Sequence, residues 1–248
     1  MKNLIVDIGN TCAKIAIYSD MQLLTDIVVA THEQMASQAI ALCAQHNVEH
    51  GIYSSVASVD IEVAFVDAIH QAHLHLEKLT ATMQMPFSIA YKTPQTLGAD
   101  RLAAVAGAVA QFPNQNLLIV DAGTAITYEY VSESGIYLGG NISPGITMRF
   151  KALHNFTGKL PISDATQFST DIGQSTYSAI AAGVMRGVNY EVDGVIDDFL
   201  KSGTHKKAII LTGGDYKSLV LKVKSCIFAR PNLVMEGIAK LCMMNFGT

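Results

Sequence analysis

The stretch Leu4–Tyr18 reads LIVDIGNTCAKIAIY, and the stretch Leu117–Tyr130 reads LLIVDAGTAITYEY. Each is an apolar β-run ending in Asp, then one residue, Gly and Asn or Thr, then a second run that alternates apolar and polar residues. This order predicts a strand, a tight turn in which Gly lets the backbone approach a ligand, and an antiparallel return strand. Such a hairpin presents amides and hydroxyls to an anion. The chain therefore predicts a duplicated fold with two anion-binding hairpins.

The remaining hydrophobic pattern predicts strands and helices in a similar order in each half of the chain. In the first half we expect strands at 23–30, 51–56 and 88–91 and helices at 32–46, 59–74 and from 99 or 100. In the second half we expect strands at 117–120, 127–131, 135–138 and 208–212 and helices at 146–154, 176–200 and 233–244, with an irregular loop at GGNISPG.

This pattern predicts an α/β protein with two domains, 1–114 and 115–248, each with a mixed sheet, and a ligand cleft between them. Pro113, Asn114 and Asn116 mark the boundary. Two hairpins facing each other would hold a polyphosphate from both sides, as a nucleotide-dependent phosphotransferase requires.

Composition limits the class of protein. Half of the residues are hydrophobic and 15% are charged, which disfavours extensive disorder. A net charge of −4 gives no electrostatic reason to bind nucleic acid. No apolar run is long enough to span a membrane, and MKNLIVDIGN leads directly into a strand without a signal peptide, so we expect a cytoplasmic protein. The four widely spaced Cys residues are expected to be reduced thiols.

The first hairpin carries a set of polar side chains suited to phosphate. Asp7 could hold a Mg²⁺ ion or its water, Asn10 and Thr11 add donors, and Lys14 could neutralise developing charge. Taken alone, these residues also fit an ordinary turn, in which Asp, Gly and Asn are common. The second copy, with Asp121, Gly123, Thr124 and Thr127, favours phosphate binding.

Three further segments could contribute to a site. The Gly-rich stretch 139–145 could bring backbone close to a ligand, and Thr212–Gly214 could let a base or ribose lie against the backbone, although simple turns explain both. Asp100 and Arg101 open a helix, whose dipole favours an ionised carboxylate that can accept a proton. A helix-capping role for Asp100 is equally compatible with the sequence.

Other motifs argue against alternative sites. His70, His73 and His75 suggest a metal cluster, but no carboxylate or Cys completes it, and a solvated helix end is favoured. The chain has neither the P-loop motif nor the Rossmann glycine motif. Nucleotide binding would therefore use the paired hairpins.

Five motifs in order, DIGNT, GADR, DAGTA, GGNISPG and TGGD, give the chain a close resemblance to a known family. It resembles the type III pantothenate kinases, within the superfamily of acetate and sugar kinases, heat-shock chaperones and actin. The resemblance covers nearly the whole chain. It implies two ribonuclease-H-like domains of the actin-like ATPase type, and ATP-dependent phosphorylation of pantothenate to 4′-phosphopantothenate, which opens coenzyme A synthesis.

The resemblance also implies residue roles. Asp100 would accept the proton, Asp7 would lie near Mg²⁺, and Asp121 would help bind K⁺ or NH₄⁺. ATP would be bound by Asp7, Ile8, Gly9, Asn10, Thr11, Cys12, Ala13, Lys14 and Thr124. Pantothenate would be bound by Tyr91, Gly98, Ala99, Asp100, Arg101 and Thr176. Cys12 and Ala13 differ from the residues common in the family, but an amide-lined loop makes little use of their side chains.

One expected helix carries small residues that bear on subunit association. Ala179, Gly183 and Gly187 form a small-residue stripe on one helix, which fits either intramolecular packing or a helix from a second subunit. Members of the family are typically homodimers, so the resemblance favours a homodimer.

Two alternative functions stay open. One is a non-catalytic nucleotide-sensing regulator of the same fold, and the other is a related sugar or acetate kinase.

Overall fold

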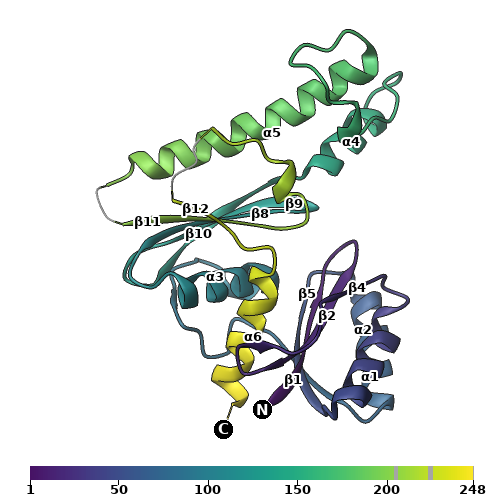
Figure 1. Cartoon of the computed structure of the whole chain (residues 1–248), viewed down its shortest axis with the longest axis vertical. Coiled ribbons are helices and arrows are strands. Elements are labelled where there is room, and N and C mark those ends of the chain that lie inside the picture. The colour runs from purple at the N-terminus through teal and green to yellow at the C-terminus, as the bar shows by residue number, and fades with distance from the viewer. Residues whose placement is uncertain (204–205, 223–225, 248) are drawn as a thin grey trace. The chain divides into compact units, whose positions relative to one another are not determined.

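The computed structural model describes residues 1–203, 206–222 and 226–247 (Figure 1). The chain forms two compact units. The first comprises Met1–Pro113, Ser134–Leu138 and Asn232–Thr248, and the second comprises Asn114–Glu133 and Gly139–Pro231. The helix α6 (Leu233–Phe246) therefore belongs to the first unit although it comes last in the sequence. A single cut at residue 114 does not describe these units, and the two-domain division stays a prediction.

A mixed sheet forms the centre of the first unit. Its strand order is β3-β2-β1-β5-β6, and β4 also pairs with β2. The pairing of β1 with β2 is antiparallel, whereas β5 is parallel to both β1 and β6. The strands are β1 (Lys2–Ile8), β2 (Ala13–Ser19), β3 (Gln22–Leu23), β4 (Val28–Ala30), β5 (His50–Ser55) and β6 (His75–Lys78).

The two faces of β1 have different neighbours. Leu4, Val6 and Ile8 are fully buried in a cluster with residues of α1 (Met35–His46) and α2 (Val59–Gln71). Alternate residues of a strand point to opposite faces, so Ile5 and Asp7 point to the other face. There, α6 contacts β1 and β5, and α3 (Ala99–Gln111) contacts β5. Asp7 therefore shares a sheet face with the helix that carries Asp100.

Helices α3 and α6 pack closely because glycine lies at their contact. A Cβ atom on Gly237 would lie 1.8 Å from the carbonyl oxygen of Ala103, and one on Gly107 would lie 2.6 Å from that of Leu233. Real Cβ atoms do not approach backbone this closely, so neither position accepts a larger residue without a shift of one helix.

The second unit repeats the strand arrangement of the first. In its sheet, the order is β12-β11-β8-β9-β10. The central strand β8 (Asn116–Ala122) pairs antiparallel with β9 (Ala125–Val131) and parallel with β11 (Lys207–Thr212), as β1 does with β2 and β5. The duplicated α/β fold with mixed sheets that the sequence predicts is confirmed.

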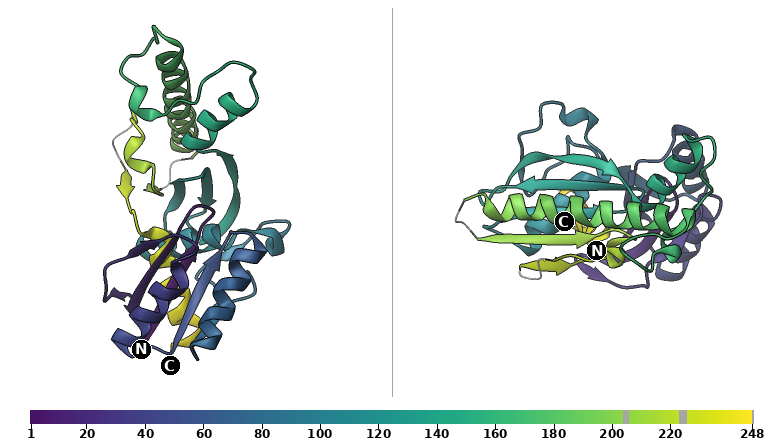
Figure 2. Two further views of the ribbon diagram at one scale, coloured as in Figure 1. Left: turned by 90° about the vertical axis from the view of Figure 1, so that its right-hand side faces the viewer. Right: turned by 90° about the horizontal axis from the view of Figure 1, so that it is seen from above.

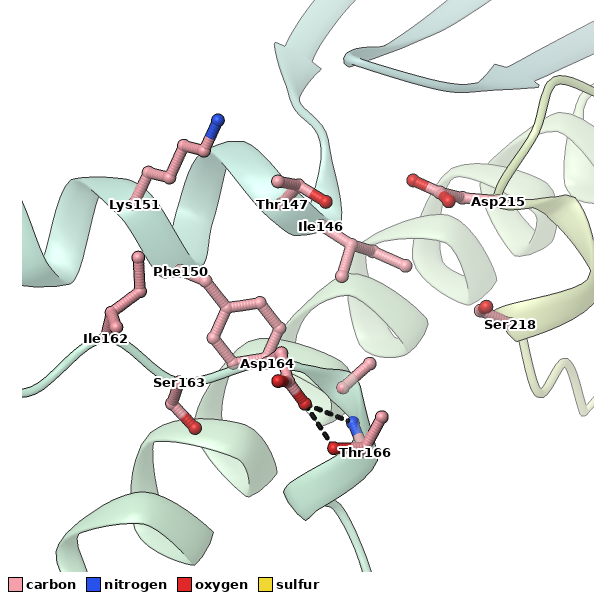
Figure 3. Close-up of a pocket in the computed structure, with 11 residues that line it drawn as sticks. Ile146, Thr147, Phe150, Lys151, Ile162, Ser163, Asp164, Thr166, Asp215 and Ser218 are labelled. Atoms are coloured by element: carbon pink, nitrogen blue, oxygen red, sulfur yellow. Dashed lines mark hydrogen bonds between the residues drawn. The ribbon is translucent and has the colours of Figure 1, made fainter.

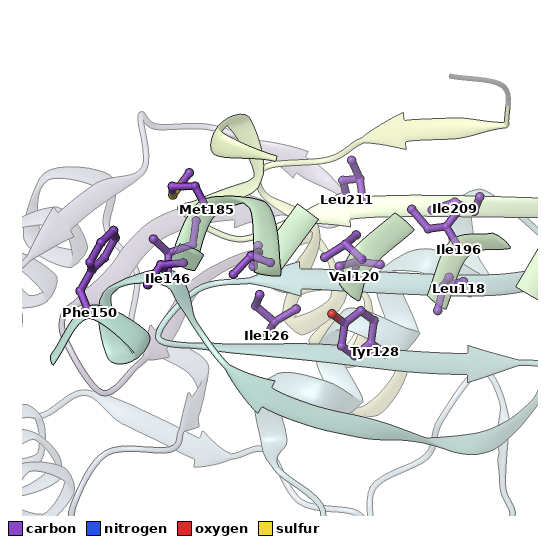
Figure 4. Close-up of a cluster of buried hydrophobic side chains, with 14 of the residues drawn as sticks. Leu118, Val120, Ile126, Tyr128, Ile146, Phe150, Met185, Ile196, Ile209 and Leu211 are labelled. Carbon is purple, nitrogen blue, oxygen red and sulfur yellow. The ribbon is translucent and has the colours of Figure 1, made fainter. Parts of the chain in front are cut away.

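One long helix covers a face of the second sheet. Figure 2 shows α5 (Thr176–Lys201) running along the strands of this sheet. Its buried residues, including Met185 and Ile196, meet Val120, Ile126 and Leu211 of the strands in one apolar cluster (Figure 4). Burial of this cluster fixes β8 and the hairpin at its end against a rigid support. None of the helices in the described ranges has the length and apolar content to span a bilayer.

The structure differs from the sequence-based expectation in several strands. The single strand expected at 23–30 is wrong: β3 and β4 are two short strands, and residues 24–27 lie outside both. β10 (Ile136–Pro144) continues as a strand through GGNISPG, so the prediction of an irregular loop there is wrong. Beyond residue 138 it is the edge strand of the second sheet, and an edge strand tolerates Gly and Pro. Two further strands, β6 (His75–Lys78) and β12 (Ile227–Ala229), are not predicted by the hydrophobic pattern, and both are short and partly exposed.

The remaining elements are short or lie where the sequence predicts helices. The helix α4 (Ile146–Asn155) agrees with the prediction of 146–154. The strand β7 (Ser88–Ile89) pairs in parallel with Ile136 and Tyr137 at the start of β10, inside the first unit. Three single-turn helices are η1 (Pro94–Thr96), η2 (Ala165–Gln167) and η3 (Tyr216–Ser218).

Candidate functional site

The first predicted hairpin forms a four-residue turn between β1 and β2. The amide of Gly9 donates to the carbonyl of Cys12 at 3.0 Å, which closes the turn. The side chains of Asn10 and Thr11 are exposed. His32 Nε2 lies 2.9 Å from the carbonyl oxygen of Gly9, and because that oxygen can only accept, Nε2 carries the proton. Asn10 and Thr11, two of the residues predicted to bind phosphate, thus stand in an exposed turn that His32 holds from one side.

Asp7 lies at the centre of the sheet beside two polar neighbours. It pairs with Lys14 on the antiparallel strand and with Ser54 on the parallel strand. Side chains at paired positions point to the same face, so these three groups lie side by side. The atoms Asp7 Oδ1 and Ser54 Oγ are both buried, and the Ser54 hydroxyl stabilises the ionised Asp7 carboxylate. Asp7, Lys14 and Ser54 therefore form a polar group on the sheet face opposite the apolar cluster of Leu4, Val6 and Ile8.

The pKa of Asp7 is affected by a second carboxylate nearby. The pKa of the Asp7 carboxyl is raised from 3.8 to about 6, mainly by burial and in addition by the negative charge of Asp100. The ammonium group of Lys14 and the hydroxyl of Ser54 lower this pKa. The first unit therefore brings Asp7 and Asp100, which are far apart in the sequence, into electrostatic contact. Two neighbouring carboxylates favour the binding of a cation.

The start of α3 positions Asp100. Gly98 is the N-cap, and Asp100 is in the first turn, where the helix dipole stabilises a negative charge. The amide of Arg101 donates to Asp100 Oδ1 at 2.8 Å. A Cβ atom on Gly98 would lie 2.5 Å from the same oxygen. A residue larger than glycine at position 98 would therefore collide with the Asp100 carboxylate.

An aromatic cluster surrounds Arg101. Arg101 is 6% exposed, and its Nη2 donates to the hydroxyl of Tyr137 at 3.0 Å. Its guanidinium lies 5.8 Å from the ring centre of Tyr91, which stacks on Tyr137 at 6.1 Å. The structure thus brings together Tyr91, Gly98, Ala99, Asp100 and Arg101, all predicted to bind the acceptor substrate. A buried, oriented guanidinium is suited to binding a carboxylate.

The second hairpin has the same layout as the first. Asp121 pairs with Thr127 on the antiparallel strand and with Thr212 on the parallel strand. The amide of Gly123 donates to the carbonyl of Ala125 at 3.0 Å. The repeat thus preserves the central carboxylate, whereas Lys14 and Ser54 are replaced by two threonines.

Two glycines allow other backbone segments to lie directly on the second hairpin. Gly213 has a φ of +91°, and a Cβ atom there would lie 2.2 Å from the carbonyl oxygen of Ala122. A Cβ atom on Gly145 would lie 2.1 Å from the carbonyl oxygen of Gly123. The motifs TGGD and GGNISPG are therefore packed around this hairpin within the second unit.

A cavity of about 440 Å³ lies beside the TGGD turn in the second unit (Figure 3). The amide of Asp215 donates to the carbonyl of Ala122 at 2.8 Å, which links the cavity wall to the hairpin. Burial raises the pKa of the Asp215 carboxyl. The walls are mostly apolar, as in small-molecule pockets. They are formed by Ile146, Thr147, Phe150, Lys151, Ile162, Ser163, Asp164, Ala165, Thr166, Asp215 and Ser218.

Thr176 occupies a separate place in the second unit. It is the first residue of α5 and is exposed, and it lines a shallow depression with Gly173 and Ala179. Ser175 caps the helix through the amide of Ser178 at 3.2 Å. The structure of this unit alone gives Thr176 no neighbour among the residues predicted to bind substrate, so its role stays a prediction.

The titration of Asp7 provides a direct check on this geometry. We expect the Asp7 carboxyl to titrate near pH 6 in carbonyl NMR spectra of the folded protein, with a higher midpoint in Lys14→Met because a neighbouring positive charge is lost. Since this pKa lies above its value of 3.8 in an unfolded chain, Asp7 should make the free energy of unfolding fall as pH rises from 3.8 to about 6. A midpoint near 4 in both proteins would contradict the described burial.

Comparison with known proteins identifies the family. A family model described as type III pantothenate kinase matches residues 3–198. The chain belongs to the type III pantothenate kinase family. Among relatives named type III pantothenate kinase, the one from Porphyromonas gingivalis (strain W83) is 45% identical over 248 residues, with 98% of each chain covered. The one from Bacteroides fragilis (strain YCH46) is 40% identical over 245 residues, with 99% of each chain covered.

Solved structures support the fold of this type III pantothenate kinase family member. A protein from Campylobacter jejuni assigned to the Baf family of transcriptional activators has a TM-score of 0.63 at 24% identity, with 98% of each chain covered. The activator of 2-hydroxyisocaproyl-CoA dehydratase from Clostridium difficile, solved with bound ADPNP, has a TM-score of 0.54 at 12% identity, covering 97% of this chain and 93% of that one. At these identities the comparison concerns the fold alone.

Three residues near the first hairpin of this family member are not identifiable as site residues from the sequence alone. The sequence pattern predicts only a short strand for Ser54 and Ser55 and only the start of a helix for His32. The only signal available was the pair of serines at the end of an apolar run, which is common in strands. Their relation to Asp7 depends on the parallel pairing of β5 with β1.

Proposed function

We propose that this protein transfers the γ-phosphoryl group of ATP to the primary hydroxyl of pantothenate, giving 4′-phosphopantothenate, the first step of coenzyme A biosynthesis. The observation that carries the proposal is the full-length match to curated relatives named type III pantothenate kinase. The rivals, a non-catalytic nucleotide sensor and a sugar or acetate kinase, have no comparable support, because the likeness to the Baf protein concerns the fold alone.

In this proposal the two hairpins bind the phosphates of ATP. Residues Asp7–Lys14 supply turn amides, hydroxyl and amide side chains and the Lys14 ammonium, and Thr124 supplies a further contact. The cavity next to TGGD takes the adenosine moiety, since it offers apolar walls of suitable volume beside the second hairpin. Binding the phosphates through backbone amides suits a loose, highly charged transition state.

Asp7 fits a role in holding Mg²⁺. Its carboxylate oxygen Oδ1 is buried, and the negative charge of a second carboxylate, Asp100, helps to raise its pKa. Oxygen ligands of this kind, together with phosphate oxygens and water, are what Mg²⁺ prefers. When bound, the ion would neutralise charge on the β- and γ-phosphates. Asp121, in the corresponding place of the second unit, is the proposed ligand of K⁺ or NH₄⁺.

Asp100 is the proposed proton acceptor. The pantothenate hydroxyl oxygen forms a bond to the γ-phosphorus, the bond from that phosphorus to the bridging oxygen breaks, and ADP leaves. The hydroxyl proton passes to the Asp100 carboxylate, which lies in the first turn of α3, where the helix dipole favours negative charge. Arg101 binds the pantothenate carboxylate, and Tyr91, Gly98 and Ala99 line the same pocket. Thr176 adds a contact from the start of α5.

We also propose that the protein is a cytoplasmic homodimer. Gly183 and Gly187 have open space where a Cβ would be, so this part of the small-residue stripe on α5 leaves room for a second helix. Exposed Tyr177 and Tyr190 lie on the same helix. Light scattering should give the mass of a dimer, and Gly183→Arg should give that of a monomer; a monomeric wild type at all concentrations would exclude this arrangement.

A coupled ADP-release assay tests the proposed activity. Pantothenate, glucose and acetate are offered as separate acceptors, each with K⁺ or Na⁺ as the only monovalent cation. We expect turnover with pantothenate only, stimulated by K⁺. ADP release that does not depend on any acceptor would favour the sensor, and turnover with glucose or acetate would favour the related kinase.

A further inference from the structure

Arg149 stands at an unusual position for a cation. It lies near the start of α4, where the helix dipole disfavours positive charge and where no acidic residue of the same turn compensates it. Its side chain is 21% exposed. A cation in such a place needs partners outside its own helix.

Those partners come from two other elements of the second unit, β10 and α5. Arg149 Nε donates to the carbonyl of Pro144 at 2.8 Å, and Nη2 donates to Ser143 Oγ at 2.9 Å and to Glu191 Oε2 at 2.5 Å. The other oxygen of Glu191 accepts from the buried hydroxyl of Tyr128 at 2.7 Å. The guanidinium therefore ties the end of β10 to α5 and β9.

The segment held by Arg149 lies directly on the second hairpin. The amide of Gly145 donates to the carbonyl of Thr124 at 3.1 Å. The space for a Cβ on Gly145 is taken by the carbonyl oxygens of Gly123 and Thr124, at 2.1 and 2.4 Å. A displacement of residues 143–145 would therefore displace the turn that carries Thr124.

We propose that Arg149, oriented by Glu191, is a positioning residue for ATP binding, which fixes residues 143–145 against the Gly123–Thr124 turn and so sets the place of Thr124. This rests on the proposed function, in which Thr124 contacts phosphate. Arg149 itself touches no phosphate. Its planar fork donates in several directions at once, whereas the single ammonium of a lysine cannot keep all three partners in place.

The test measures the affinity for a non-hydrolysable ATP analogue by calorimetry, together with KM for ATP and for pantothenate. We expect Arg149→Met and Arg149→Lys to weaken analogue binding and raise KM for ATP by roughly tenfold, the scale for losing hydrogen bonds to a charged group, with KM for pantothenate changed less than about twofold. Glu191→Gln, which keeps the shape of the side chain, should have a smaller effect in the same direction.

Lys207→Met is the matched control. Lys207 also donates to backbone carbonyls, those of Leu200 and Gly203. However, it is the first residue of β11, whereas Thr212, which pairs with Asp121, is the last. It should lower thermal stability without changing analogue affinity. Because the binding assay needs no turnover, a wild type that binds the analogue but does not phosphorylate pantothenate would overturn the proposed function and leave this test intact.

A double-mutant cycle with Thr124→Ala separates positioning from general stability. If Arg149 acts through Thr124, Arg149→Met should reduce analogue affinity much less in the Thr124→Ala background than in the wild type. Folded Arg149→Met and Arg149→Lys proteins that bind the analogue as the wild type does would overturn the proposal. So would effects that add fully with that of Thr124→Ala.

Discussion

Replacing Asp100 with asparagine is expected to lower kcat by about 10²- to 10⁴-fold, while binding of ATP changes little. Asparagine keeps the size and the hydrogen-bond acceptor that the amide of Arg101 uses, but it cannot take up the hydroxyl proton. The carboxylate stands in the first turn of α3, beside the aromatic cluster around Arg101. The measurement is steady-state turnover with pantothenate, alongside calorimetric binding of a non-hydrolysable ATP analogue.

Asp60→Asn is the matched control for this variant. Asp60 is the second residue of α2 as Asp100 is of α3, but it is exposed, so its variant should keep wild-type turnover. Asp100→Asn should also lower the pKa of Asp7 below about 6, since the charge of Asp100 helps to raise it. If Asp100→Asn lowered the pKa of Asp7 but retained full turnover, Asp100 would be near the site but outside the mechanism.

Gly237→Ala is expected to lower the free energy of unfolding by about 3 kcal/mol, the upper part of the range for overpacking a core. The added methyl carbon would meet the carbonyl of Ala103 at 1.8 Å, and the obstacle is backbone, which no side-chain rotation can remove. Either α6 must move away from α3 or the helices must distort. The measurement is chemical unfolding followed by circular dichroism, with the melting temperature as a second readout.

Gly194→Ala, another glycine substitution inside a helix, is expected to change the free energy of unfolding in the opposite direction. Gly194 also lies inside a helix, but no described residue outside its own stretch of helix lies within 4 Å of the place where its Cβ would be. Alanine favours helix more than glycine does, so this variant should raise the free energy of unfolding by about 0.5–1 kcal/mol. If the two variants had equal stabilities, the close contact of α3 with α6 would not exist as described.

The twin hairpins were predictable because their signal is local. A buried run, an Asp, a Gly and an alternating return strand stand within 15 residues of Leu4–Tyr18, and the second copy removes the ambiguity that each has alone. The helix start at Gly98–Arg101 was predictable for the same reason. These local motifs also carry the family resemblance, which the comparisons confirm.

What the sequence could not reveal depends on contacts between distant segments. Ser54 becomes a neighbour of Asp7 only through the parallel pairing of β5 with β1. Arg149 looks like an ordinary helix residue until β10 continues as a strand and brings Ser143 and Pro144 beside it. The continuation itself was hidden because glycine and proline predict a turn on their own, whereas an edge strand accepts them.

The place of α6 has a consequence for how the protein is made. The helix closest to the carboxyl end covers β1, the first strand to leave the ribosome, and completes the packing of α3. Domains usually fold as units during translation. Here the amino-terminal unit must wait, with one apolar face uncovered, until synthesis of the second unit is complete, and its capture by chaperones in that interval is a physical expectation of the topology.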